Sequence, residues 1–545
     1  MNITQLQDMG QSLFSKRSTL MSLWQEMGEN FYPERADFTL RRTIGTDFAA
    51  GLMTSYPVLC RRDLGDQIST MLRPTAKAWF HVALRDPFSE DNEGKRMLEW
   101  ASQVQRRAMY DPVALFTRAT KEGDHDFACF GQCVISVRLN KAADALLYRC
   151  FHLRDVAWAE NEEGKIGMIF RKWKPTCQDL VRLFGDKVHS EVKQAMARNQ
   201  PLTEVECMHM VVEADLYDEK ANGKPYWSIT YDTEHQHQME AVAVWSREYA
   251  IPRWQTVSGS QYAFSPATIA ALPDARLIQA MTYTLLEAGE KVVNPPMVAT
   301  KDAVRSDMAI YAGAVTWVDR DYDERLGEAL RPMNIDAKGM PLGIEMQKDA
   351  RSMLAACFFL NKLTMPQRGP EMTAYEVGQR IQEYIRGALP IFEPMEMSYN
   401  GEVCMLTWDL LLRNGAFGDP RTFPRNVRAA IEGGAMQFRF ESPLHDAIEA
   451  QKGQKFLEMK GLLAEAIAMD PNASAVPDVI TALRDALDGV GVPAKWVRDD
   501  TTVKQMQAAQ QAAEQSAALL DSMQKGADVA ATLATAQQTQ AAVSP

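Results

Sequence analysis

The sequence lacks a long apolar run, a secretory leader and a dense set of cysteines. No stretch of about 18 uninterrupted apolar residues occurs in its 545 positions, so we expect no transmembrane helix. The first ten residues, MNITQLQDMG, contain no basic segment followed by an apolar one, which argues against a secretory signal. The eight cysteines are too scattered for a disulfide framework, so a reducing cytoplasm is the expected place of synthesis.

The chain also lacks an excess of positive charge. It has 59 Lys and Arg against 71 Asp and Glu, a formal net charge of −12. A protein that holds nucleic acid tightly over a large surface needs many cations that displace counterions, so the composition disfavours that class. It allows a protein past which nucleic acid slides. The 46% hydrophobic and 24% charged content is typical of a soluble globular chain, here with about three or four folding units.

The usual signatures of catalytic and nucleotide-binding sites are missing. The sequence contains no G-x-x-x-x-G-K-[ST], no G-x-G-x-x-G after a strand, no G-x-S-x-G and no H-E-x-x-H. These absences argue against a P-loop motor, a dinucleotide-binding enzyme, a serine hydrolase of the elbow type and a zinc protease. We therefore predict that the protein is not an enzyme and needs no cofactor.

One partial metal signature is present. His235 and His237 alternate in DTEHQHQME and could bind a metal together with Asp232 or Glu234. Alternating polar residues in a strand or turn more often face solvent, and spacing alone fixes no third ligand. The signature leaves open a metal-dependent enzyme that processes nucleic acid, as the weakest of the alternatives.

The segment VDRDYDER resembles the start of a calcium-binding EF-hand loop. Asp319, Asp321 and Asp323 occupy alternate positions, but the required glycine is Glu324 and the twelfth-position glutamate is Leu330. We interpret the segment as an exposed acidic turn.

Cys129 and Cys133 flank three residues in CFGQC. A redox pair has two intervening residues at a helix N-terminus, whereas this setting reads as an apolar strand. We expect buried structural cysteines.

Hydrophobic spacing divides the first half of the chain into helices and strands. Residues 1–35 are predicted as one helix ended by Pro33, and residues 47–74 and 95–125 as further helices. Residues 145–245 carry most of the strand signal, in LLYRCFHL, KIGMIFRKW, VECMHMVVEADLY, YWSITYD and AVAVW. One helix, at about 176–197, interrupts these strands.

The second half is predominantly helical. Asp274 can cap a helix over 274–293, which ends at Asn294-Pro295-Pro296, and a second helix is predicted at about 342–360. The polar segment NKLTMPQRGPEM separates it from a long helix kinked at Pro390 and Pro394. QFRFESPL is predicted as a strand followed by a helix start. Residues 444–490 are helical with a break at DPNASAVPD, where Asp478 can cap the next helix.

Four segments, in their order and at their separations, carry a family likeness. They are LRPTAKAWFHV (72–82, with Pro74, Trp79 and Phe80), REYAIPRWQTVSGSQYAFSPATIAALPDARLIQAM followed by a helix ending in NPPMVA, MTAYEVGQRIQEYIRG (372–387) and FRFESPLHDA. Together they resemble the head-to-tail connector, or portal, proteins of short-tailed bacteriophages. The resemblance covers roughly residues 10–490, nearly the whole chain.

The resemblance implies a helix-rich α+β portal fold with a β-rich wing and clip, paired stem helices, a long kinked wing helix, a helical crown and a C-terminal barrel. The implied regions are the N-terminal wing (1–273), stem helix 1 (274–293), the clip (294–341), stem helix 2 (342–360), the tunnel loop (361–373), the wing with the kinked helix (374–444), the crown (445–495) and the helical barrel (496–545). A disordered tail is the alternative to the barrel, because a lone Ala/Gln-rich helix frays.

The resemblance also implies the role. Portals form dodecameric rings at one capsid vertex, through which double-stranded DNA is packaged and ejected, and they work in the virion after assembly in the host cytoplasm. The implied partners are the terminase large subunit, the major capsid and scaffolding proteins, and the tail adaptor and nozzle proteins, with no membrane. The alternative is a non-ring structural virion protein, such as an internal scaffold or tail component, which predicts a monomer or an open filament.

Charge suits a conduit for DNA. A ring of twelve subunits of −12 each carries about −144 formally, so most of its surface repels phosphate. A few cations at the constriction could centre the duplex, and the proposed tunnel loop offers Lys362 and Arg368, with Asn361, Thr364 and Gln367 as uncharged contacts. The alternative is that both cations are ordinary solvated loop charges.

Two further sets of residues are assigned interface roles. Glu376, Arg380 and Glu383 are spaced four and three apart, which places them on one helix face and favours an ion-pair network within or between subunits. The clip is expected to meet its partners through four residues near its centre: Trp317, Asp319, Asp321 and Asp323.

Overall fold

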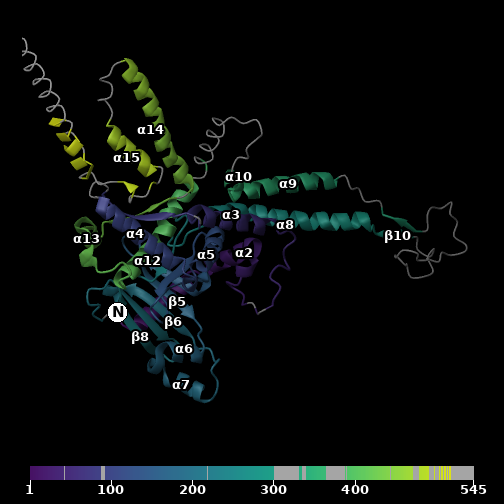
Figure 1. The fold of residues 1–545 in the computed structure, drawn as a ribbon. Coiled ribbons are helices and arrows are strands. Elements are labelled where there is room, and N and C mark those ends of the chain that lie inside the picture. Colours follow the sequence, from purple (N-terminus) through teal and green to yellow (C-terminus); the bar gives the residue numbers. More distant parts are fainter. Residues whose placement is uncertain are drawn as a thin grey trace, which may run out of the picture. The chain divides into compact units, whose positions relative to one another are not determined.

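The computed structural model describes most of the chain. The residues outside the description are 42, 44, 76, 87–91, 218, 300–329, 334–338, 364–386, 388, 389, 442, 470–477, 490, 491, 493–495, 498–501, 504, 507, 511, 514 and 517–545. The chain divides into two compact units, each described below by itself. Unit 1 comprises residues 1–80, 103–418 and 440–444, and unit 2 comprises residues 81–102, 419–439 and 445–545. The predicted helix-rich α+β class is confirmed (Figure 1).

The N-terminal segment of unit 1 forms two helices. Helix α1 (Ile3–Lys16) begins with a capping box on Asn2, and α2 (Ser18–Phe31) is followed by the 3-10 turn η1 (Pro33–Arg35). The predicted single helix over 1–35 is therefore wrong at one point. The helix is interrupted at Arg17. The buried side chain of Arg17 donates to the carbonyl oxygens of Leu153 (2.8 Å) and Val156 (2.7 Å).

A five-stranded antiparallel sheet contains four of the five predicted strands, and the first of them, LLYRCFHL, is β3 (Leu146–Phe151) of a separate three-stranded sheet. The order of the five-stranded sheet is β4-β5-β6-β7-β8, with β4 Val156–Glu160, β5 Ile166–Trp173, β6 Cys207–Glu213, β7 Tyr226–Asp232 and β8 His237–Val244. Between β5 and β6 the chain forms α6 (Cys177–Phe184), η5 (Gly185–Lys187) and α7 (Ser190–Ala197), so the helix predicted over 176–197 is two helices. The 3-10 turn η6 (Ala214–Leu216) follows β6.

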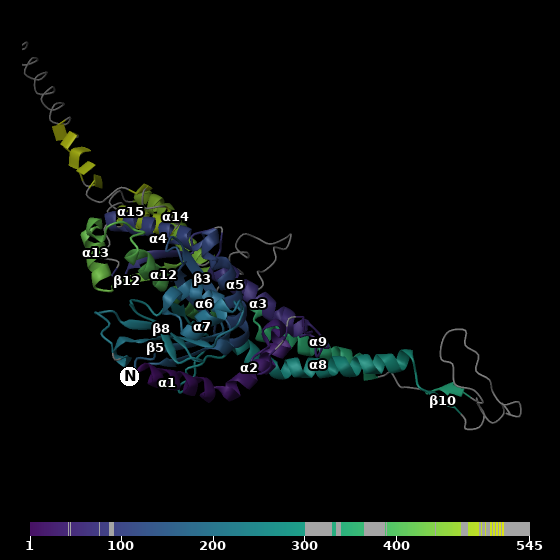
Figure 2. The same cartoon turned by 90° about the horizontal axis from the view of Figure 1, so that it is seen from below.

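Helix α1 covers one face of this sheet (Figure 2). Leu6 of α1 is fully buried against Phe170, Met208 and other sheet residues. The contact is close at Gly10, where a Cβ atom would lie 2.7 Å from Cδ1 of Phe170. A side chain at this position would push the helix away, so the glycine sets how closely α1 packs on the sheet.

A three-stranded sheet, in the order β3-β2-β9, packs against the helices of unit 1. Its strands are β2 (Val134–Leu139), β3 (Leu146–Phe151) and β9 (Tyr249–Ala250), and η4 (Leu153–Asp155) follows β3. Cys129 ends helix α5 (Phe116–Phe130) rather than lying in a strand, and Cys133 follows the left-handed Gly131. Both thiols are free and buried, as predicted, and burial raises the pKa of each.

The helical core of unit 1 brings together segments far apart in the sequence. Helix α3 (Tyr56–Leu72) packs on α5, and α12 (Glu402–Arg413) follows a π-helical turn, η8 (Glu396–Gly401). The described helix from Pro390 to Arg413 is thus continuous, and its irregularity is the π-helical turn that begins two residues beyond Pro394. The remaining short element of this unit is η3 (Pro112–Ala114).

Unit 2 is built from a small sheet and several helices. Strand β1 (Phe80–Leu84) pairs with β12 (Met436–Phe440), the strand predicted in QFRFESPL, and helix α4 (Asn92–Met109) begins in this unit. The 3-10 turn η9 (Pro420–Thr422) precedes α13 (Arg425–Glu432). Helices α14 (Pro443–Met469) and α15 (Val479–Gly489) confirm the predicted helices, and Asp478 Oδ1 accepts from the Thr481 amide at 3.1 Å as the predicted cap.

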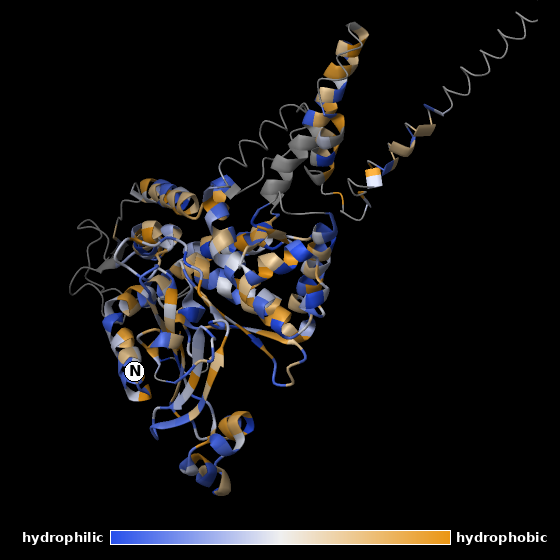
Figure 3. Cartoon of the chain, turned by 90° about the vertical axis from the view of Figure 1, so that its left-hand side faces the viewer, coloured by the Kyte–Doolittle hydropathy of each residue, from blue (hydrophilic) through white to orange (hydrophobic). Residues whose placement is uncertain are grey.

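The helices carry apolar and polar residues together rather than uniformly apolar surfaces (Figure 3). None of the helices among the described residues is long and apolar enough to cross a membrane.

Candidate functional site

A pair of long helices in unit 1 corresponds to the two predicted stem helices. Helix α8 spans Pro266–Val293 and α9 spans Gly339–Cys357, and they run side by side (Figures 1 and 2). The predicted starts, residues 274 and 342, are both too late. Helix α8 begins eight residues earlier because Ser265 caps it and Pro266 occupies its first turn, so Pro273 lies inside the helix.

The first three turns of α8 are fixed in the core of unit 1. Ser265 Oγ donates to the carbonyl of Ala128 (2.8 Å), and Thr268 Oγ1 donates to that of Cys129 (2.6 Å). Farther along, the Gln279 side chain accepts from the amides of Met53 (2.8 Å) and Thr54 (3.0 Å) and donates to the Thr54 carbonyl (3.0 Å). The base of the pair is therefore held by a polar network that spacing analysis did not reveal.

Small and polar side chains set the approach of α9 to α8. A Cβ atom at Gly343 would lie 2.8 Å from Cδ2 of Leu285, so a larger residue here would require the Leu285 side chain to shift. Gln347 Nε2 donates to Thr282 Oγ1 at 2.7 Å across the pair. Several other apolar side chains of the two helices are not buried by these contacts.

Large apolar side chains on both helices are exposed. On α8, Tyr283, Leu286 and Val293 are spaced three and seven residues apart and are 57%, 60% and 86% exposed. On α9, Leu342 is 62% exposed and Ile344 57%. Exposed apolar patches of this kind mark interaction surfaces in soluble proteins. A helix with apolar residues on more than one face cannot bury all of them against a single neighbour. Counting the apolar residues on each face of the two predicted helices could therefore have revealed these exposed side chains.

The charged residues of the helix pair nearly balance. From residue 282 onward, the two helices carry four acidic side chains and three basic ones: Glu287, Glu290, Glu345 and Asp349 against Lys291, Lys348 and Arg351. Lys291 pairs with Glu287 (2.6 Å), one turn away. The pair therefore presents no cationic stripe that would retain a phosphate backbone.

A two-stranded antiparallel ladder closes the segment between α8 and α9. Strand β10 (Met297–Ala299) follows α8 and pairs with β11 (Leu330–Pro332), which precedes α9. The ladder brings residues 299 and 330 together at the base of the intervening segment. The predicted clip residues Trp317, Asp319, Asp321 and Asp323 lie outside the described residues.

The start of the predicted tunnel loop follows α9. Buried Phe358 packs on Phe31 with ring centroids 5.5 Å apart, and Phe359 has a left-handed backbone (φ 59°) that turns the chain into α10 (Leu360–Leu363). Asn361 and Lys362 are exposed on this short helix. The other predicted loop and network residues lie outside the described residues: Thr364, Gln367, Arg368, Glu376, Arg380 and Glu383.

Of the predicted histidine pair, His235 lies in the turn between β7 and β8 and His237 begins β8, and His189 lies nearby at the start of α7. The His189 and His235 rings stack at 4.8 Å between centroids, and His235 Nδ1 lies 2.7 Å from buried Asp232 Oδ2. His237 Nε2 instead lies 2.9 Å from the carbonyl of Lys187. Within the described part of the chain, no group of three or more His, Cys, Asp or Glu is arranged to hold a metal ion.

His235 is expected to make the stability of this corner depend on pH. Burial opposes its charged form, but the hydrogen bond to Asp232 and the charges of Asp232, Glu191 and Glu234 raise its pKa above the usual value. Its contribution is therefore full below pH 6.5 and is lost as pH rises through the raised pKa. Thermal midpoints from pH 5.5 to 8.5 should show His235→Gln destabilising more at low pH. His237→Gln, whose ring contacts a backbone carbonyl, is the control, and equal pH profiles would contradict the assignment.

Comparisons with known proteins agree with the resemblance found in the sequence. The family described as "Bacteriophage head to tail connecting protein" matches residues 4–497. The chain is similar to a "Probable portal protein" of Bordetella phage BPP-1, with 23% identity over 534 residues that cover 96% of this chain and 93% of the relative. It is also similar to the "Portal protein" of Salmonella phage epsilon15, with 23% identity over 317 residues, 56% of each chain.

The family match covers well over half of the chain and includes helices α8 and α9, the four sheets of the described residues and most of unit 2. The predicted recognition and the predicted portal function are therefore confirmed. The chain belongs to the bacteriophage head-to-tail connecting protein family.

Proposed function

We propose that the protein forms a closed ring at one vertex of a phage capsid, with α8 and α9 of neighbouring subunits packed side by side. The observation that carries this proposal is the exposed apolar surface on the helix pair, with Leu286 and Leu342 each more than half exposed. Interfaces between permanent partners are more hydrophobic than ordinary surface, and in a ring each subunit contacts its two neighbours through two different patches. A head-to-tail arrangement of identical subunits closes into a ring when the rotation between neighbours completes a circle.

The regions of the chain take the corresponding roles in this proposal. Residues 274–293 and 342–360 act as stem, 294–341 as the clip that meets the terminase large subunit and later the tail adaptor, and 361–373 as the tunnel loop. The ring is dodecameric, double-stranded DNA passes through it in packaging and ejection, and Lys362 with Arg368 centres the duplex. The near balance of charge on the described stem residues supports a channel that does not retain DNA.

The ring is tested by imaging the protein alone. We expect class averages of negatively stained particles to show closed rings with a central hole. The double variant Leu286→Glu/Leu342→Glu should abolish the rings, because each ring would bury a charged side chain at every subunit contact. Light scattering after size-exclusion chromatography should then give the mass of one chain.

A matched variant separates assembly from solubility. Leu202 is 75% exposed in the segment between α7 and β6, so Leu202→Glu makes the same chemical change away from the stem. It should leave the rings intact. Rings that persist in the double variant would contradict the stem interface, and open filaments or monomers of the unchanged protein would favour the non-ring virion component.

A further inference from the structure

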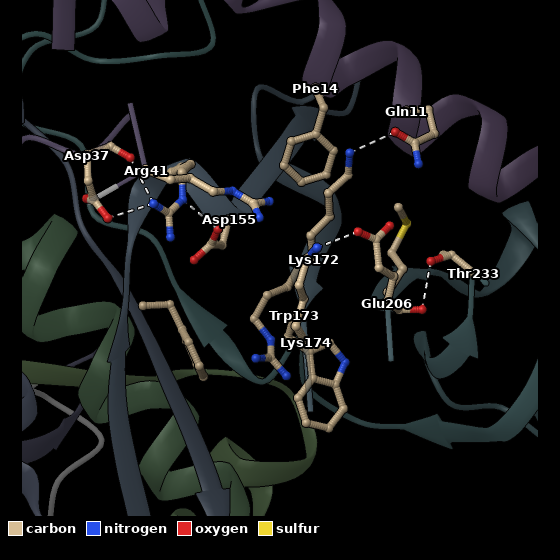
Figure 4. Close-up of a pocket in the computed structure, with 14 residues that line it drawn as sticks. Gln11, Phe14, Asp37, Arg41, Asp155, Lys172, Trp173, Lys174, Glu206 and Thr233 are labelled. Atoms are coloured by element: carbon tan, nitrogen blue, oxygen red, sulfur yellow. Dashed lines mark hydrogen bonds and ion pairs between the residues drawn. The ribbon is translucent and has the colours of Figure 1, made fainter. Parts of the chain in front are cut away.

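A cavity in the β-rich part of unit 1 is lined by an unusual concentration of cations. It measures about 680 Å³, within the size range of ligand-binding cavities. Helix α1, the segment after η1, the end of β3, η4 and strands β5 and β6 contribute its walls (Figure 4). Five cations line it, in a chain whose net charge is −12: Arg41, Arg154, Arg171, Lys172 and Lys174. We call it the basic cavity.

The carboxylates that line the basic cavity already have partners. Asp37 binds Arg154 and His152, each at 2.6 Å, and although burial acts against it, these two contacts lower the pKa of Asp37 to about 2. Asp155 also binds Arg154 (3.0 Å). Glu206 pairs with Lys174. All three acids therefore form ion pairs with residues of the cavity or next to it.

Three cations of the cavity have no carboxylate partner among the residues that the structure describes. Arg41 is exposed, Arg171 donates through Nε to the hydroxyl of Tyr249 (3.1 Å), and Lys172 donates to Gln11 Oε1 (2.8 Å). Burial and the nearby charge of Arg17 lower the pKa of Lys172, although the charge of Glu206 acts in the opposite direction. The basic cavity thus carries three cations that form no ion pair among the described residues, and the charge of Glu206, which is already paired with Lys174, acts on Lys172 and Arg41 from farther away.

Aromatic rings hold two of these cations in place. The Arg171 guanidinium lies over the rings of Phe151 (4.4 Å) and Trp173 (4.9 Å), and the Lys172 ammonium lies over Phe14 (4.3 Å). With Nε committed to Tyr249, the two terminal nitrogens of Arg171 remain as a fork of donors. A fixed guanidinium fork matches the two oxygens of a carboxylate.

The same contacts restrict the kind of ligand. The cations already cover a face of each aromatic ring, so the rings are poor platforms for stacking a nucleobase. A cavity of this size admits side chains but not a nucleic-acid duplex. We propose that the basic cavity binds an extended, Asp- or Glu-rich segment of a partner protein, whose carboxylates pair with Arg41, Arg171 and Lys172. This proposal goes beyond the ring and the channel and depends on neither.

The test uses the full chain and a fluorescein-labelled peptide of five glutamates, with a five-glutamine peptide as the uncharged probe. Fluorescence polarisation should show binding of the glutamate peptide alone, weakening as salt is added. Arg171→Gln/Lys172→Gln should weaken binding by at least about tenfold, because charge-assisted hydrogen bonds are lost. Arg41→Gln removes an exposed cation, so it should keep the fold and weaken binding severalfold.

The control variant is Arg182→Gln, which removes an exposed cation of α6 that does not line the cavity. It should bind the peptide as the unchanged protein does. Three outcomes would overturn the proposal: no binding of the glutamate peptide, equal loss in the Arg182 control, or a DNA oligonucleotide or inorganic phosphate that displaces the peptide at lower concentration than unlabelled peptide does. Thermal midpoints of all variants identify any that fail to fold. If Arg171→Gln/Lys172→Gln does not fold, the binding measured for Arg41→Gln decides whether the proposal holds.

Discussion

Replacing Arg73 with leucine is expected to destabilise unit 1 by about 3–5 kcal/mol, because it leaves a buried carboxylate without its partner. Arg73 follows α3 directly and is only 5% exposed, and its guanidinium pairs with Asp124 of α5. It also donates to Asn400 Oδ1 (2.8 Å) and lies over the ring of Tyr399 (4.7 Å). One side chain therefore joins α3, α5 and the π-helical turn before α12.

A double variant separates the contribution of the Arg73–Asp124 ion pair from the cost of leaving one buried charge without a partner. Arg73→Leu/Asp124→Leu removes both charges, so it should recover much of the loss seen in the single variant. Arg118→Leu is the matched control, because Arg118 pairs with Glu122 on the exposed side of the same helix α5 (3.2 Å) and should cost less than about 1 kcal/mol. Thermal midpoints measured by scanning fluorimetry give the comparison. A single variant as stable as the control would contradict the network.

Replacing Arg17 with methionine is expected to cost about 2–4 kcal/mol and to loosen helix α1. The Arg17 guanidinium donates to three backbone carbonyls of one turn, those of Leu153, Arg154 and Val156. Each buried carbonyl left without a donor costs roughly 1–3 kcal/mol, offset in part because burial of the cation, which lowers its pKa, is relieved. The guanidinium also lies 4.7 Å from the ring of Phe14.

Limited proteolysis with thermal melting distinguishes this role from a general charge effect. Arg17→Met should expose α1 to cleavage at a temperature where the unchanged protein resists. Lys16→Met, one residue earlier and exposed, removes the same charge and should change neither measurement. Arg17→Lys should fall between them, since one ammonium group cannot serve three carbonyls in the same geometry. Equal cleavage of the Arg17→Met and Lys16→Met variants would contradict this role of Arg17.

Two residues of the segments that carried the family resemblance have structural roles in this protein. Trp79 is buried and stacks near Phe116 and Phe440, with ring centroids 6.5 and 6.4 Å away, and its Nε1 donates to Tyr110. Ser265 caps α8 and binds the end of α5. These contacts explain why such segments can indicate a fold.

Prediction from the sequence was accurate where the signal is local. Apolar patterning predicted strands β5 to β8 of the five-stranded sheet and β3 of the three-stranded sheet, but not β4, and the cap at Asp478 marked the start of α15. Such signals succeed because periodicity and capping depend on neighbours in the chain. The prediction was wrong at Arg17 and at the start of α8. The apolar pattern continues through Arg17 without interruption, and the predicted helix begins at Asp274 although Ser265-Pro266 offers the stronger start signal.

The sequence by itself determined the helix-rich α+β class, the absence of recognisable catalytic motifs, and the family, through four ordered segments. Only the tertiary structure decided that Arg73 and Asp124 form a buried pair, that Gln279 joins helix α8 to the backbone of residues 53 and 54, and that three cations without an ion-pair partner among the described residues line one cavity. The reason is physical. Local pattern records which face of an element is apolar, whereas the pairing of side chains tens or hundreds of residues apart depends on how those elements pack.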